Sequence, residues 1–219
     1  MTPLPHFSPS MRIVDEEGER LYLDASERTA FMKAAFTVLN KQQRMFCHVL
    51  YETGCRPTEA LNLTANCVDV ENKRIRIRSL KKRKTDKHGK PTKALYREIP
   101  VDPFFIRELD TVFDIRVRQA NSELDKSLLW SYGKTTAWKL IKKAMTEANI
   151  HGKRASAKSL RHSYGVMLCT ADHPPPLHII AKMMGHSNTS YTEVYLSVVG
   201  NEESKLIMNA KGKSAALYT

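Results

Sequence analysis

The chain has 219 residues, and its 35 Lys and Arg against 23 Asp and Glu give a formal net charge of +12. With 42% hydrophobic and 26% charged residues, the composition is that of a globular protein and excludes a mostly disordered basic tail. The apolar runs are short and interrupted by charge, so the sequence predicts no membrane span, and the N-terminus lacks the apolar stretch of a secretory signal. Four single cysteines, without a Cys-x-x-Cys pair, indicate reduced thiols in a cytoplasmic protein.

In chain order, residues 1–25 predict an extension with a small hairpin, and amphipathic spacing predicts helices over much of the rest. These helices are expected at about residues 26–39, 42–52, 57–63, 102–119, 135–148, 156–170, 178–184 and 189–198. Ser26 is the expected N-cap of the first helix, and Gly54 is expected to end the second. Residues of about 67–101 have the pattern of a small sheet. The sequence thus predicts a mainly α fold with a small antiparallel β-sheet.

The positive charge is concentrated between Lys73 and Arg97, where twelve basic residues and the single acid Asp86 leave a net charge of +11. Residues 74–78 alternate Arg and Ile as a half-buried strand does, and residues 96–101 are a suitable partner strand. The segment between them contains Gly and Pro, which are typical of a turn. We therefore expect a β-hairpin whose basic tip and face contact a nucleic-acid backbone.

Four short motifs follow one another along the chain. They are Thr53-Gly-Cys-Arg56-Pro-Thr-Glu59, the basic hairpin, Lys158-Ser-Leu-Arg161-His162, and Gly185-His186 followed by Tyr195. In this order the sequence resembles the tyrosine recombinase (phage-integrase) family, whose catalytic domain carries TGxRxxE, a hairpin lysine, HxxRH and GHxxxxxxxxY. The resemblance covers about residues 26–200, and the four motifs together are far more specific than any one of them.

The resemblance implies that Arg56 and Arg161 clamp the DNA phosphate that is attacked. Charge develops on the non-bridging oxygens, and a guanidinium offers fixed, paired donors that lysine cannot reproduce. Arg56 also precedes the helix start at Pro57, where free backbone N–H groups favour an anion. Glu59 lies on the same helical face, so it is expected to hold Arg56 in position.

Tyr195 is the nucleophile that the resemblance implies, and His186 contacts the scissile phosphate or that nucleophile. A phenol is a weak nucleophile at neutral pH and needs a proton acceptor and a cationic pocket. The attack leaves a covalent 3′-phosphotyrosyl link and a free 5′-hydroxyl, and it conserves bond energy, so no metal, ATP or other cofactor is expected. Tyr191 lies one helical turn earlier, but its spacing from His186 does not fit the family pattern.

The family supplies the proton for the leaving oxygen from a hairpin lysine, and Lys81 matches that position best. Lys82 and Lys84 are close enough to be alternatives. Most of the other lysines of the hairpin are expected to contact DNA phosphates. The expected DNA-binding residues are Lys82, Arg83, Lys84, Lys87, Lys90 and Lys93.

Lys158 departs from the family pattern, which usually has His at this position. Lysine keeps a positive charge for a phosphate oxygen but is normally protonated at neutral pH, so Lys158 acts either as a third clamp or as a base in an unusual environment. His162 is expected to point to a different side of its helix and to have a structural role. Cys169, His173 and His178 fit no zinc spacing, and we expect no metal site.

We expect residues 1–25 to form an N-terminal extension, residues 26–200 the catalytic domain, and residues 201–219 a tail that docks on a neighbouring subunit. Family members commonly carry a separate DNA-binding domain before the catalytic domain, and the first 25 residues are too few for one. The sequence therefore predicts a catalytic-domain-only recombinase.

The resemblance implies double-stranded DNA as partner, self-association into a synaptic tetramer, an accessory DNA-binding protein, and a place in the cytoplasm at the nucleoid. The reaction is integration, excision, inversion or resolution, depending on where the DNA sites lie. Two other functions stay open: a non-catalytic DNA-binding protein with the same fold, which Lys158 favours, and a topoisomerase-like relaxing enzyme.

Overall fold

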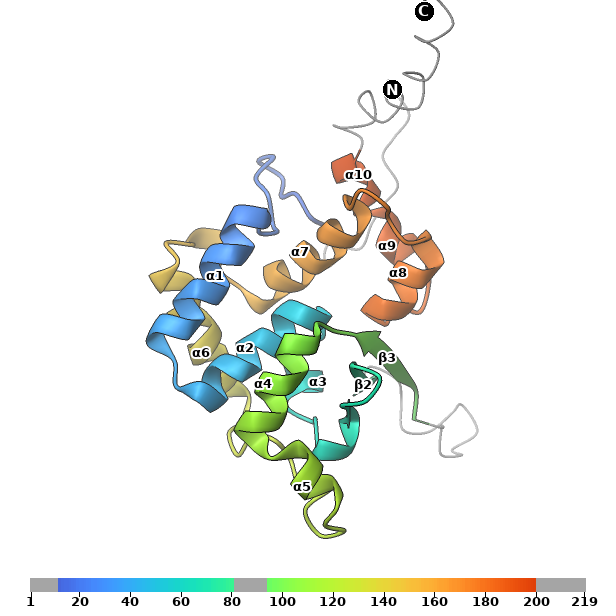
Figure 1. Cartoon of the computed structure of the whole chain (residues 1–219). Helices are drawn as coiled ribbons and strands as arrows, with labels where there is room; N and C mark the ends of the chain where they lie inside the picture. Colours follow the sequence, from blue (N-terminus) through green and yellow to red (C-terminus); the bar gives the residue numbers. More distant parts are fainter. Residues whose placement is uncertain (1–11, 81–93, 200–219) are drawn as a thin grey trace, which may run out of the picture.

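The computed structural model describes residues 12–80 and 94–199, which form a set of helices and a three-stranded antiparallel sheet at one side of the molecule (Figure 1). The helices are α1 (Ala25–Val38), α2 (Lys41–Thr53), α3 (Pro57–Ala60), α4 (Pro103–Phe113), α5 (Ile115–Gln119), α6 (Lys134–Glu147), α7 (Ala157–Cys169), α8 (Leu177–Met184), α9 (Ser190–Glu193) and α10 (Leu196–Val199). The strands are β1 (Val68–Asp69), β2 (Arg74–Arg78) and β3 (Tyr96–Pro100). The expected mainly α fold with a small antiparallel sheet is confirmed.

Helix α1 begins one residue earlier than expected, with Asp24 and not Ser26 as its N-cap. The Asp24 carboxylate accepts a hydrogen bond from the Glu27 backbone N–H (2.9 Å), and the Glu27 carboxylate accepts one from the Asp24 N–H (3.0 Å). This reciprocal pair satisfies two backbone groups that the helix start leaves free. The Ser26 hydroxyl donates to Asp24 (2.7 Å) and so supports the cap from within the first turn.

Helix α2 ends at Gly54, as expected. Gly54 has φ 57°, a left-handed conformation that favours glycine, and its N–H donates to the carbonyl of Leu50 (3.0 Å). A Cβ on Gly54 would lie 2.4 Å from the ring of Tyr164 in α7, so glycine also lets the two backbones approach closely. This approach brings the segment that follows Gly54 next to α7.

The sheet has the strand order β1-β2-β3, and its two longer strands form the expected hairpin arms. Ile75 pairs with Ile99 and Ile77 pairs with Arg97 across the β2–β3 ladder. The isoleucines face the core and the arginines of β2 face outward, as the alternation of residue types predicts. The hairpin tip, residues 81–93, lies outside the described residues.

The expected single helix over residues 102–119 is wrong, because the chain breaks it into α4 and α5. Asp114 has φ 51° and separates the two helices. The side chain of Asp110 accepts a hydrogen bond from the backbone N–H of Arg116 (3.0 Å), which stabilises the break. Asp tolerates the left-handed conformation better than most residues, but the periodic pattern alone does not reveal the break.

Two further helices are shorter than expected. Residues 57–63 form only one helical turn, α3, and residues 189–198 form α9 and α10 with a turn at Val194 and Tyr195 between them. This turn carries the expected nucleophile, so Tyr195 is placed between two short helices and not within one long helix.

The expected small hairpin near the N-terminus is present. Val14 and Arg20 form an antiparallel bridge, and the Leu21 N–H donates to the carbonyl of Ile13 (2.7 Å). Leu23 then donates its backbone N–H to the hydroxyl of Ser163 in α7 (2.6 Å). The segment before α1 is thus attached to the helix that carries the HxxRH-like motif.

The apolar core has two parts. One lies among α1, α2, α4, α6 and the inner face of the sheet and includes Phe31, Phe46, Ile75 and Phe105. The other lies among α7 to α10 and includes Tyr164, Ile180, Met184 and Tyr195. The four cysteines are free thiols. Within the described ranges, no helix combines the length and apolar character that crossing a membrane requires.

Candidate active site

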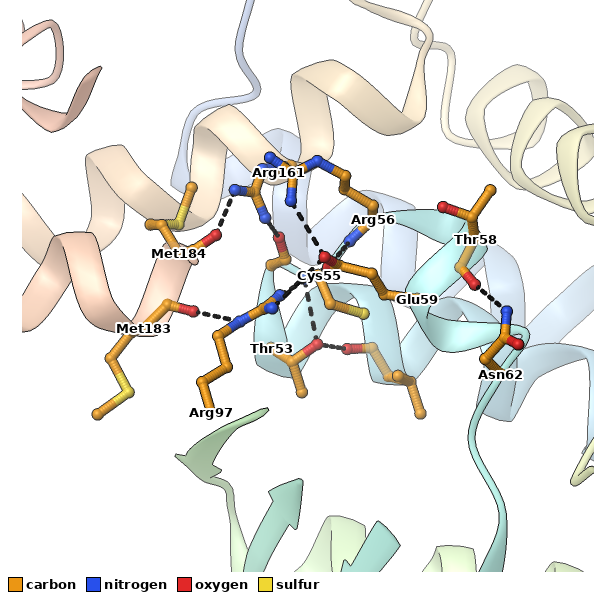
Figure 2. A network of polar contacts seen from close by, with 12 residues as sticks. Thr53, Cys55, Arg56, Thr58, Glu59, Asn62, Arg97, Arg161, Met183 and Met184 are labelled. Carbon is orange, nitrogen blue, oxygen red and sulfur yellow. Dashed lines mark hydrogen bonds and ion pairs between the residues drawn. The ribbon is translucent and has the colours of Figure 1, made fainter. Parts of the chain in front are cut away.

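Glu59 organises the first part of the site, at the start of α3. Its carboxylate accepts a hydrogen bond from the backbone N–H of Arg56 (3.0 Å) and another from the Arg56 guanidinium (3.1 Å). Pro57 at the first helical position fixes the backbone there. The contact that the sequence predicted between Glu59 and Arg56 is therefore present, and Figure 2 shows it at the centre of a larger network.

The second partner of Glu59 is Arg97 of β3, which the sequence indicated only as part of the basic hairpin. Arg97 is 5% exposed, and its guanidinium lies 2.6 Å from the Glu59 carboxylate. Its Nε donates to the carbonyl of Met183 (2.9 Å) at the end of α8 (Figure 2). Arg97 therefore joins α3 to α8 and does not face outward. Arg97 lies two residues before the buried Ile99 in β3, so both side chains point to the same face of the strand. This alternation is the sequence feature that could have predicted the burial of Arg97.

Arg161 of α7 is held between two backbone carbonyls. Its guanidinium donates to the carbonyl of Gly54 (2.7 Å) and to that of Met184, so one side chain connects the ends of α2 and α8 (Figure 2). Burial, followed by the charge of Arg56, lowers the pKa of Arg161 to about 10, which leaves it a cation at neutral pH. The two guanidinium groups expected to clamp a phosphate thus interact electrostatically, and one of them is fixed by the backbone.

Tyr195 lies in the same region, but its side chain is enclosed. It is 0% exposed, and its ring occupies the space above Gly165, where a Cβ would lie 2.5 Å away. Burial raises the pKa of Tyr195 to about 12, although the charges of Arg161 and Arg56 oppose that rise. The phenol is therefore protonated at neutral pH.

His162 contacts the Tyr195 hydroxyl, which the sequence did not predict. Its Nδ1 lies 3.0 Å from that oxygen, and the residue is 3% exposed. Burial, followed by the charges of Lys158 and Arg161, lowers the pKa of His162 to about 3. His162 therefore faces the turn between α9 and α10, and its expected structural role stays a prediction.

His186 packs against Tyr195 from the other direction. It follows Gly185, which has φ 65°, and its Nδ1 lies 2.8 Å from the hydroxyl of Thr192. The imidazole stacks near the Tyr195 ring, with centroids 6.4 Å apart and planes at 20°. Burial and the neighbouring arginines lower its pKa to about 3, so it is neutral at neutral pH. Tyr191, in contrast, is 39% exposed, and its ring is nearly perpendicular to that of His186, with centroids 6.3 Å apart and planes at 83°.

The other expected site residues are either exposed or outside the described ranges. Lys158 is exposed in the first turn of α7. Lys81 and the other basic residues of the hairpin tip lie outside the described residues. They are Lys82, Arg83, Lys84, Lys87, Lys90 and Lys93. Among the described residues, no group of three or more His, Cys, Asp or Glu could hold a metal ion.

The buried histidines predict a loss of stability in mild acid. Burial lowers the pKa of His48 to about 4, and His162 and His186 have pKa values of about 3. The unfolded chain protonates below pH ~6.5, whereas the folded chain keeps these rings neutral, so the free energy of unfolding falls as pH falls below that value. Each buried histidine loses ~1.4 kcal/mol of stabilisation between pH ~7.5 and ~5.5, so for the three together we expect a loss of about 4 kcal/mol.

Urea unfolding at the two pH values measures this loss. A His48→Asn variant, which leaves the residues around Tyr195 intact, should lose about a third less stability than the wild type over the same interval. Equal stability of the wild type at both pH values would contradict the assignment of the three rings as buried and neutral.

The fold is that of a tyrosine recombinase catalytic domain. A family model described as "Phage integrase family" matches residues 21–202, and the chain belongs to this family. The resemblance seen in the sequence motifs is confirmed.

Sequence relatives agree with this family. Tyrosine recombinase XerC of Lacticaseibacillus casei is 28% identical over 177 residues, which are 75% of this chain and 53% of the relative. Tyrosine recombinase XerA of Thermococcus onnurineus is 27% identical over 166 residues, with 72% and 51% covered. The chain thus spans about half the length of these curated relatives.

Solved structures show the same fold. A crystal structure of XerA recombinase has a TM-score of 0.60 and 22% identity and covers 80% of this chain and 59% of that one. XerH site-specific recombinase bound to palindromic difH substrate, as a post-cleavage complex, has a TM-score of 0.65, 19% identity and 90% and 56% coverage. The Tn1549 transposon integrase in complex with transposon right end DNA has a TM-score of 0.65, 18% identity and 94% and 70% coverage.

Proposed function

We propose that this chain cuts and rejoins double-stranded DNA in site-specific recombination, through a covalent 3′-phosphotyrosyl intermediate at Tyr195. The observation that carries the proposal is the convergence of Arg56 and Arg161 on Tyr195. Both guanidinium groups act electrostatically on the phenol, and Arg161 is fixed by two backbone carbonyls. Fixed cations beside a potential nucleophile suit a reaction that builds negative charge on a phosphate.

The reaction begins when the Tyr195 oxygen attacks phosphorus. Arg56 and Arg161 bind the non-bridging oxygens of the phosphate, and His186 forms a hydrogen bond with the phosphate or with Tyr195. The O5′–P bond breaks, and the leaving oxygen takes a proton from a hairpin lysine, for which we propose Lys81. Rejoining reverses these steps with a 5′-hydroxyl from another strand, so the bond energy is conserved throughout.

Glu59 has a supporting role in this proposal, because it holds Arg56 and does not face the substrate. Lys158 is exposed at the N-terminus of α7 and is proposed as a third cationic contact to the phosphate. The basic hairpin tip is proposed to grip the DNA backbone beside the cleaved phosphate.

DNA is also the molecule named in the solved neighbours. XerH was solved with difH substrate, and the Tn1549 integrase with transposon DNA. For this chain we propose double-stranded DNA as substrate, self-association on DNA into a synaptic tetramer, and an accessory DNA-binding protein. The proposal places the chain in the cytoplasm, at the nucleoid.

Covalent capture tests the function and identifies the DNA site in the same experiment. The protein is incubated with a pool of random-sequence duplexes, each with a nick that lets the released strand diffuse away, and DNA that stays bound after denaturation is sequenced. We expect the wild type to enrich one sequence family and Tyr195→Phe to enrich none. Tyr191→Phe, which changes a neighbouring exposed tyrosine, should enrich the same family as the wild type.

The other outcomes separate the alternatives. Sequence-specific binding without any covalent capture would show a non-catalytic DNA-binding protein. Capture without strand exchange between two captured sites, together with relaxation of a supercoiled plasmid that carries one site, would show a relaxing enzyme.

A further inference from the structure

The closest polar contact of the Tyr195 hydroxyl among the described residues is with His162. The two side chains are almost fully enclosed, and the imidazole Nδ1 lies 3.0 Å from the phenol oxygen. The other ring nitrogen, Nε2, is buried without a hydrogen-bond partner in the described part of the chain. This arrangement commits Nδ1 to the hydroxyl and leaves no competing protein acceptor or donor on the ring.

The surroundings of His162 keep the ring neutral. Lys158 and Arg161 approach it from its own helix, and Tyr195 and His186 face it from the turns around α9. The positive charges and the burial of the ring oppose imidazolium formation in the free protein. A neutral imidazole has one nitrogen with a lone pair, and with the proton on Nε2 that lone pair is on Nδ1.

Tyr195 needs such an acceptor. Burial raises the pKa of its phenol, so the oxygen attacks phosphorus only if its proton is removed during the attack. Lys158 occupies the motif position where the family usually has His, but its side chain is exposed, and among the described residues the hydrogen-bond partner of the Tyr195 hydroxyl is His162.

We propose that His162, and not Lys158, accepts the Tyr195 proton when this tyrosine attacks DNA; the inference rests on the proposed function. The Oη–H bond breaks, the Oη–P bond forms and the O5′–P bond breaks. The phenol proton goes to Nδ1 of His162, and the leaving oxygen takes its proton from the general acid. His162 becomes an imidazolium and returns the proton to Tyr195 when the strand is rejoined.

The bound DNA provides a negative charge near His162 that the free protein lacks. A phosphate beside Tyr195 brings one negative charge, and the transition state carries more. This negative charge offsets the positive charges of Lys158 and Arg161 near the His162 ring. An opposite charge within a few ångströms favours the protonated form. Proton transfer to His162 is therefore coupled to binding of the phosphate, and the ring stays neutral until DNA is present.

Single-turnover cleavage of the captured DNA site tests this proposal in two variants. His162→Asn keeps a polar group near the hydroxyl but cannot take its proton, and Lys158→Met removes the competing amine. We expect His162→Asn to slow adduct formation about 100-fold, as for loss of a general base. Gel-shift binding at the wild-type DNA affinity shows that a variant is folded, and His162→Phe provides a second variant if the asparagine disturbs the fold.

A more acidic phenol at position 195 distinguishes a residue that accepts the phenol proton from one that only contacts the phosphate. When 3,5-difluorotyrosine replaces Tyr195, the phenol ionises more easily, so the defect of His162→Asn should shrink at least 10-fold while that of Lys158→Met stays unchanged. The opposite pattern, with rescue of Lys158→Met alone, would assign the base to Lys158. Adduct formation by His162→Asn at or above the wild-type rate would also overturn the inference. Absence of any adduct with the wild type would instead overturn the proposed function.

Discussion

Replacing Glu59 with glutamine is expected to lower the free energy of unfolding by about 3 kcal/mol, since removal of one partner leaves an uncompensated buried charge. That charge is Arg97, which is enclosed and has its guanidinium 2.6 Å from the Glu59 carboxylate. Burial alone would raise the pKa of Glu59, but hydrogen bonds and charge from Arg97 and Arg56 lower it below its usual value. The carboxylate is therefore ionised in the folded chain, and its charge is what the glutamine removes.

Urea denaturation measures this effect, and Glu98→Gln is the matched control. Glu98 also pairs with an arginine of the sheet, Arg76, but both side chains are about half exposed, and the loss should stay below ~1 kcal/mol. Removing both buried charges, in Glu59→Leu with Arg97→Met, should be less damaging than Glu59→Gln alone. Equal losses for Glu59→Gln and Glu98→Gln would contradict the buried network.

Replacing Arg161 with lysine is expected to slow covalent cleavage of DNA about 1000-fold, although the positive charge is kept. The guanidinium donates to the carbonyls of Gly54 and Met184 at once and is thereby aimed before DNA binds. A lysine ammonium is a single point donor that cannot keep both contacts and also present a paired donor to phosphate. Losing one preorganised donor to a developing charge costs about 100- to 1000-fold in rate.

Single-turnover adduct formation on the captured site measures this effect. Arg107→Lys, at an exposed position of α4, is the matched control and should react as the wild type does. Since Arg161 also joins α2 to α8, a thermal melt accompanies the rate measurement. A folded Arg161→Lys variant that cleaves at the wild-type rate would contradict the role of the fixed guanidinium.

Short sequence patterns predicted the parts of the fold that depend on interactions between residues close together in the chain. The alternation of Arg and Ile in residues 74–78 reports a strand with one buried face, and Gly54 reports a helix end that needs positive φ. The break at Asp114 was missed because it depends on a hydrogen bond from Arg116 to Asp110, which the apolar spacing of residues 102–119 does not reveal.

The candidate site was predicted where motif spacing carries the information and missed where contacts are long-range. Arg56 and Arg161 are more than 100 residues apart, and only the family resemblance brought them together before the structure did. Arg97 was counted only among the basic residues of the hairpin, because no local pattern links it to Glu59, which lies 38 residues earlier. The contact of His162 with Tyr195 was not predicted, because Tyr195 comes from a turn 33 residues later and no local pattern links the two residues.

The most direct test of the proposed chemistry is the identity of the bond between protein and DNA. Adduct formed on the captured site is digested with protease and nuclease, the modified peptide is sequenced by mass spectrometry, and the released DNA end is treated with polynucleotide kinase. We predict a nucleotide on Tyr195, attached through a 3′-phosphate, and a free 5′-hydroxyl that accepts phosphate directly. A nucleotide on Tyr191 or on any other side chain, or protein attached to the 5′ end, would contradict that chemistry.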